Sequence, residues 1–117
     1  MSAKTAYTQV ATALVVSGTG PIIDAGKQAG VPTEDANEVN VYINVTAAGT
    51  TVTIQAEVSP DGGTTWCPHT ALAAITTTGA VLQKLSSNVG RLMRLNVTAI
   101  TGSFTLSAWI GNKRFDG

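Results

Sequence analysis

Apolar and polar residues alternate along two neighbouring stretches of the chain, 38–46 and 51–58. The apolar positions are Val39, Val41, Ile43 and Val45 in the first stretch, and Val52, Ile54, Ala56 and Val58 in the second. A period of two places successive side chains on opposite faces, so each stretch predicts a strand with one buried face. The residues between them in the second stretch, Thr51, Thr53, Gln55 and Glu57, are expected to face solvent. A short glycine-containing link joins the two stretches and predicts an antiparallel hairpin.

The same pattern returns near the end of the chain, over residues 91–100 and 103–111. The apolar positions are Met93, Leu95 and Val97, followed by Phe104, Leu106, Ala108 and Ile110. The two stretches are joined through Thr101–Gly102 and predict a second hairpin.

The remaining segments are less regular. Residues 80–85 predict a strand, and 12–18 are compatible with one. Pro68 cannot donate a hydrogen bond to a sheet, so a strand around it lies at an edge or is broken. No helix of normal length is expected. Six to eight short strands with turn signals between them predict an all-β antiparallel sandwich, of which the jelly roll is one form.

The length of the chain and the positions of its glycines and prolines indicate the domain organisation. The chain has 117 residues, which suits a single domain spanning 1–117. Its N-terminal third is irregular: the segment 18–37 is interrupted by glycines and prolines and predicts a loop with a short strand at Ile22–Ile23. Loops of this length in compact domains usually bind something or are covered by a partner.

The stretch 57–66, EVSPDGGTTW, has the composition of a tight corner. Pro60 presets φ for a turn, and Asp61 can accept hydrogen bonds from amides that follow it. Gly62 and Gly63 adopt positive φ without steric cost. Trp66 can then cover the sheet edge or the core. We interpret these five residues as a structural turn, not as a phosphate-binding or metal-binding loop.

Charge limits the classes of partner. Only 12% of the residues are charged, against about 25% in typical domains, which suggests that partners cover part of the surface. Seven basic and seven acidic residues balance, and this argues against a nucleic-acid binder. Most acidic residues precede Gly62 and most basic residues follow it. Either neighbouring copies meet head to tail, or strands from both halves interleave and remove the asymmetry.

Residues suited to catalysis or metal binding are scarce. Cys67 and His69 are the single cysteine and the single histidine, whereas zinc sites need about four such ligands. The segment 20–28 departs from a phosphate-binding loop because five residues separate Gly20 from Gly26 and Gln28 replaces the Ser or Thr that binds magnesium. We therefore expect no enzyme activity, cofactor or metal. The chain also lacks a run of about 20 apolar residues, so no membrane span is expected.

Two motifs resemble those of small β-sandwich structural proteins of tailed bacteriophages. The first is an S-x-D-G corner followed by a tryptophan, matched by Ser59, Asp61, Gly62 and Trp66. The second is an R-L-x-V-T-x-x-T-G-x-x-T-L pattern, matched by Arg94, Leu95, Val97, Thr98, Thr101, Gly102, Thr105 and Leu106. The resemblance covers about the second half of the chain. It implies a virion component assembled in the host cytoplasm, most simply a head decoration or cement protein that oligomerises, with a trimer favoured, and binds the major capsid protein.

A partner contact is expected in the segment 18–37. The residues concerned are Ile22, Ile23, Asp24, Val31, Glu34 and Asp35. Their acidic members should face a basic surface, which Arg91, Lys113 and Arg114 of a neighbouring copy, or a capsid subunit, would provide. Two alternatives stay open, a tail or neck protein and a module that binds carbohydrate or a host surface. The second would expose aromatic rings, for which Tyr42, Trp66 and Trp109 are the candidates.

Overall fold

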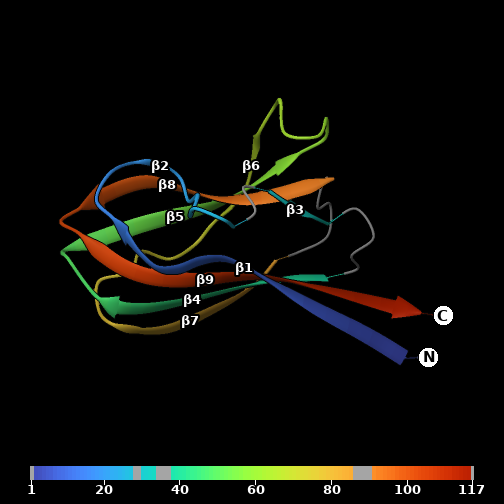
Figure 1. Ribbon diagram of the computed structural model, residues 1–117, viewed down its shortest axis with the longest axis horizontal. Helices are drawn as coiled ribbons and strands as arrows, with labels where there is room; N and C mark the ends of the chain where they lie inside the picture. Colours follow the sequence, from blue (N-terminus) through green and yellow to red (C-terminus); the bar gives the residue numbers. More distant parts are fainter. Residues whose placement is uncertain (1, 28–29, 34–37, 86–90, 117) are drawn as a thin grey trace.

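The computed structural model describes residues 2–27, 30–33, 38–85 and 91–116, and this part of the chain contains nine strands (Figure 1). They are β1 (Ser2–Val16), β2 (Gly20–Pro21), β3 (Val31–Pro32), β4 (Glu38–Ala47), β5 (Thr51–Ser59), β6 (Cys67–Ala71), β7 (Gly79–Leu85), β8 (Leu92–Thr101) and β9 (Phe104–Asp116). No helix long and apolar enough to cross a membrane occurs among these residues.

The strands form two antiparallel sheets that pack face to face (Figure 1). One sheet has the order β1-β9-β4-β7, and the other has the order β2-β8-β5-β6, with β3 also paired to β8. Strands from the two ends of the chain thus lie next to strands from its middle in both sheets. Leaving β3 aside, this is the double Greek-key order of a jelly roll. The expected all-β antiparallel sandwich is confirmed.

The core lies between the sheets and is made by the alternating apolar positions. Val39, Val41, Ile43, Val45, Val52, Ile54, Ala56, Met93, Leu95, Val97, Phe104, Leu106, Ala108 and Ile110 are all buried. Val58 is partly buried against them. The buried faces predicted from the period of two are confirmed for β4, β5, β8 and β9.

Both predicted hairpins are wrong, because each pair of consecutive strands is divided between the two sheets. β4 pairs with β7 and β9, whereas β5 pairs with β6 and β8. The links after β4 and after β8 are therefore arches, each of which passes from one sheet to the other. Both arches lie at the end of the molecule opposite the termini (Figure 1). The arches touch: Thr50 N donates to Thr101 O at 3.0 Å, and a Cβ on Gly49 would lie 2.7 Å from Ser103 N. Alternation fixes which face is buried, but not which strand lies beside it.

The other strand predictions are met with some differences. The strand expected at 80–85 is β7, and Pro68 lies in β6, an edge strand of its sheet. Pro68 is opposite Glu57, where the pairing of β5 with β6 shifts register. The stretch expected at 12–18 is the end of the much longer β1, which pairs with β9 and is interrupted by register shifts between Gln9 and Leu14.

The segment 18–37 is partly attached to the sandwich. The short strand lies at Gly20–Pro21, two residues before the expected position, and Ile22 N donates to Leu95 O at 2.8 Å. Because β2 and β3 pair with β8, Ile22 and Val31 turn into the core, where they are 3% and 1% exposed. The prediction that these two side chains contact a partner is therefore wrong.

Candidate functional site

The corner between β5 and β6 is held by hydrogen bonds to two side chains. Gly63 N donates to Ser59 Oγ at 2.8 Å, and Ser59 Oγ donates to Asp61 Oδ1 at 2.9 Å. The same carboxylate oxygen accepts from Thr65 N at 2.8 Å and from Thr64 N at 3.2 Å. Gly62 and Gly63 have φ of 79° and 104°, values that favour glycine. The Ser59 and Asp61 side chains thus accept hydrogen bonds from three successive backbone amides of the corner.

These donors determine the chemistry of Asp61. The Thr65 amide and hydroxyl, followed by the Ser59 hydroxyl and the Thr64 amide, lower the pKa of the Asp61 carboxyl to about 2. A carboxylate stabilised in this way is a poor proton acceptor near neutral pH. Among the described residues, no group of three or more His, Cys, Asp or Glu side chains could hold a metal ion. Asp61 therefore fits a structural role.

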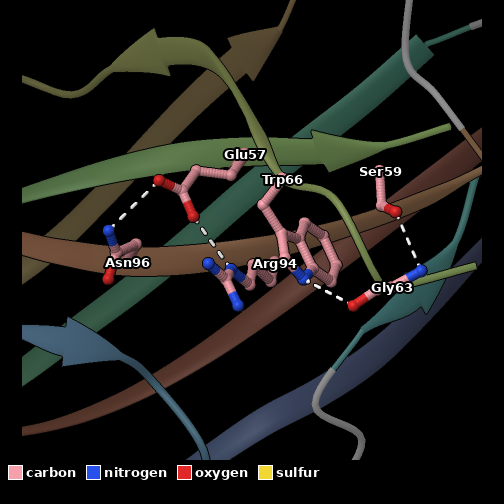
Figure 2. A network of polar contacts seen from close by, with 6 residues as sticks. All are labelled: Glu57, Ser59, Gly63, Trp66, Arg94 and Asn96. Carbon is pink, nitrogen blue, oxygen red and sulfur yellow. Dashed lines mark hydrogen bonds and ion pairs between the residues drawn. The ribbon is translucent and has the colours of Figure 1, made fainter. Parts of the chain in front are cut away.

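The corner places Trp66 over the outer surface of the β2-β8-β5-β6 sheet (Figure 2). Its Nε1 donates to Gly63 O at 3.1 Å, and the Arg94 guanidinium carbon lies 4.3 Å from its ring centroid. Such a geometry is a cation–π contact. Trp66 therefore connects the loop to a side chain that projects from β8.

Arg94 also belongs to a polar cluster with Glu57 and Asn96 (Figure 2). Arg94 Nε donates to Glu57 Oε1 at 2.8 Å, and Asn96 Nδ2 donates to Glu57 Oε2 at 3.1 Å. Glu57 lies on the outward side of β5, but it is only 8% exposed. The expectation that it faces solvent is therefore wrong: its carboxylate is held by Arg94 and Asn96 of β8.

Ion pairs within the chain join its acidic first half to its basic second half. Glu57 pairs with Arg94, and Glu38 pairs with Lys84 at 2.8 Å and with Lys113 at 3.9 Å. The Lys84 ammonium lowers the pKa of Glu38, and Glu38 in turn raises the pKa of Lys84. Of the two interpretations of the charge asymmetry, the structure favours interleaved strands.

The remaining residues predicted to contact a partner lie on several elements, and Arg91 lies next to the segment 18–37, because Thr33 N donates to Arg91 O at 2.9 Å. Ile23 is 55% exposed, while the Asp24 carboxylate accepts from Thr12 N at 2.8 Å. Arg91 is exposed, and its backbone N donates to Ser59 O. Arg114 lies in β9 opposite Lys4. Glu34 and Asp35 lie outside the described residues.

Cys67 and His69 both lie on β6, with Pro68 between them. Cys67 is exposed. His69 Nδ1 lies 2.7 Å from Thr70 Oγ1, at hydrogen-bonding distance. Both residues lie on an edge strand of the β2-β8-β5-β6 sheet, away from the aromatic residues of the other sheet.

The outer face of the other sheet has an open hollow of about 420 Å³. It is lined by Tyr7, Tyr42, Ile43, Asn44, Ala80, Val81 and Trp109, which come from all four strands of the sheet. We call this the aromatic hollow. Tyr42 and Trp109 occupy outward positions of strands predicted from the sequence. Tyr7 was missed because it precedes the stretch that showed strand character.

Comparison with known proteins identifies no relative: no family model matches the chain, and neither a curated protein nor a solved structure matches it significantly.

Proposed function

We propose that this protein is a structural component of a tailed-bacteriophage virion, namely a decoration or cement protein that stabilises the head by binding between capsid subunits. The observation that carries the proposal is the corner from Ser59 to Trp66, in which contacts within the fold account for the conformation. Ser59 and Asp61 hold the loop, and Trp66 fastens it to Arg94. The motif that resembles phage structural proteins thus serves to build the sandwich.

The fold supports the same proposal by analogy. Jelly rolls occur in viral capsid proteins, but also in lectins and cupins, so fold alone does not select a function. The low charge of the chain adds support, because a surface covered by partners needs fewer charges for solubility. In this proposal the chain is assembled in the host cytoplasm and functions as part of the virion.

The partners would be other copies of the chain, with a trimer favoured, and the major capsid protein. A standard interface buries about 1,600 Å², and symmetry-related copies acting together convert modest contacts into high avidity. Among the described residues of the segment 18–37, Ile23 is the large apolar side chain that is exposed. We therefore place the contact of this segment at Ile23.

The test uses particles of a phage whose genome encodes this chain. Mass spectrometry of purified particles should detect the protein, and electron microscopy of particles with the gene deleted should show density missing from the head lattice. Loss of density from the tail or neck would favour the alternative position. Absence of the protein from wild-type particles would refute the virion proposal.

The contact at Ile23 is tested by adding purified protein back to the deletion particles. Ile23→Ser should reduce binding, whereas Val15→Ser, which alters another exposed apolar residue, should not. Sedimentation of the free protein should show a reversible oligomer. A monomer at high micromolar concentration would contradict self-assembly away from the particle.

A second candidate function, carbohydrate binding, is favoured by a different observation: the aromatic hollow contains Tyr42 and Trp109, two of the three rings considered for this role.

A further inference from the structure

The register of β1-β9-β4-β7 determines how the aromatic hollow is built. Cross-strand pairing places Gln9, Trp109, Tyr42 and Leu82 in one row across the outer face. The next row contains Tyr7, Gly111, Asn40 and Lys84. On the other side of the aromatic row, Asn44 and Ala80 are paired. Small side chains therefore lie beside large rings, which leaves a depression in the surface.

Gly111 allows Tyr7 to complete this arrangement. A Cβ at Gly111 would lie 2.3 Å from Tyr7 Cε1, so the tyrosine ring occupies the space above the glycine. It thereby extends across β9 to Tyr42, with ring centroids 5.2 Å apart and an interplanar angle of 68°. The two hydroxyl oxygens are 3.2 Å apart. An edge-to-face pair of this kind is a favourable aromatic geometry.

The lining has a distinctive chemistry. Half of the chain's six aromatic residues line the hollow, together with the amide of Asn44 and aliphatic groups. None of the lining side chains carries a charge at neutral pH. The volume lies in the range of about 300–1,000 Å³ typical of ligand sites. The hollow thus offers flat apolar rings with neutral hydrogen-bonding groups beside them.

We propose that the aromatic hollow binds a neutral glycan. A pyranose ring has an apolar C–H face and a rim of hydroxyl groups. The C–H face can pack on the indole of Trp109, with weak C–H to π attraction in addition to burial. Its hydroxyls can exchange hydrogen bonds with the tyrosine hydroxyls and with Asn44. This proposal does not depend on the virion assignment.

A second copy of the chain fits the hollow less well. A standard protein interface involves about 20–30 residues on each side. Among the described residues, the apolar lining of the hollow consists of three aromatic rings with Ile43, Ala80 and Val81, and Leu82 is paired with Tyr42 beside them. This lining is bounded by Lys84, which forms an ion pair with Glu38, and Glu38 in turn pairs with Lys113. The apolar surface suits one or two sugar rings better than a protein face.

Two tryptophans allow a direct test with an internal control. The ¹⁵N-labelled protein is titrated with maltohexaose, cellohexaose and N-acetylchitohexaose, and with oligogalacturonate as an anionic comparison. The indole signal of Trp109 should shift with at least one neutral sugar, while that of Trp66, on the other sheet, should not. Three results would each overturn the proposal: no shift of Trp109 with any neutral sugar, equal shifts of both indoles, or a response to the anion alone.

Variants then locate the site by calorimetric titration. Trp109→Ala should weaken binding by at least about tenfold. Gly111→Ala should weaken it several-fold by displacing Tyr7, although every lining ring is still present. Val15→Ala, which changes an exposed residue on the same strand as Tyr7 but outside the lining, should bind normally. Equal affinities for all three variants would refute binding in the hollow.

Self-association is distinguished by dilution without sugar. If the Trp109 signal broadens as protein concentration rises, and Tyr7→Ala removes that effect, the hollow is an interface between copies and the glycan proposal is wrong. A spectrum independent of concentration, together with the expected sugar response, supports it.

Discussion

The two outer faces of the sandwich carry aromatic residues that have different surroundings. On the β2-β8-β5-β6 sheet, Trp66 comes from a loop and lies against Arg94, which is paired with Glu57 (Figure 2). On the β1-β9-β4-β7 sheet, Trp109 and Tyr42 project from the strands themselves, and no loop residue lines the hollow between them. The chain thus covers part of one face with its own loop and leaves the other open.

The difference shows how an aromatic residue can contribute to stability on one face and to recognition on the other. The covered face contains polar groups that are shielded from water, and such groups are usually hydrogen-bonded. Both carboxylate oxygens of Glu57 have donors, whereas Asn96 Oδ1 is buried without a partner among the described residues. The open face contains neutral rings, and Tyr7 is 51% exposed. Substitutions on the covered face should therefore affect folding, whereas those on the open face should affect binding.

The largest expected effect is at Glu57. Glu57→Ala removes both acceptors and leaves Arg94 and Asn96 without their carboxylate partner. We expect a loss of about 3 kcal/mol in the free energy of unfolding, because breaking a largely buried ion pair is costly. Urea unfolding measures it. The double variant Glu57→Gln with Arg94→Met should lose less, since no charge is left unpaired, and a loss below about 1 kcal/mol for Glu57→Ala would contradict this account.

The next effect concerns the loop that covers this face. Gly62 has a φ of 79°, so Gly62→Val forces a β-branched residue into the left-handed region at a cost of at least about 1–2 kcal/mol. Gly18→Val is a matched control, because a Cβ added to either glycine would meet no atom within 4 Å and, of the two, Gly62 alone has a positive φ. Chemical unfolding should separate the two variants. Equal losses would show that φ is not the cause.

Acid should weaken the same loop. The pKa of Asp61 is about 2 in the folded protein, compared with an ordinary value of 3.8. Its stabilising contribution is therefore complete above the ordinary pKa and is lost as the pH falls through the folded value. Thermal unfolding should show that the Tm difference between wild type and Asp61→Asn shrinks between about pH 5 and pH 2. A difference independent of pH would contradict the hydrogen-bonded carboxylate.

A smaller effect is expected on the open face, where the pKa of a tyrosine should change. The hydrogen bond with Tyr7 is the main cause that raises the pKa of Tyr42 above its ordinary value of 10.0. Tyr7→Phe should lower the pKa of Tyr42 towards that value, as followed by ultraviolet absorbance during alkaline titration. Gly111→Ala should do the same if it displaces the Tyr7 ring. An unchanged Tyr42 titration in both variants would refute the tyrosine pair.

Strands and buried faces could be predicted from the sequence because alternation is a local property. Val41 and Leu95, for example, lie on the expected faces of their strands. Pairing could not be predicted in this way. The close approach of Gly49 to Ser103 belongs to two arches that are far apart in the sequence, and a short glycine-containing link is compatible with either a hairpin or an arch.

The candidate sites were predictable to different extents for similar reasons. Tyr42 and Trp109 could be assigned to outward positions from the pattern alone. Tyr7 could not, since it precedes the stretch that shows strand character and its position depends on Gly111 in the facing strand. The burial of Glu57 also depends on distant residues, namely Arg94 and Asn96 in β8.

The difference between the two faces is tested most directly by replacing each tryptophan with threonine and comparing the free energies of unfolding in urea. Threonine suits a strand, so Trp109→Thr should lose less than about 1 kcal/mol. Trp66→Thr should lose about 2 kcal/mol, because the loop is no longer attached to Arg94. Equal losses, or a larger loss for Trp109, would contradict the claim that the chain closes one face and leaves the other open.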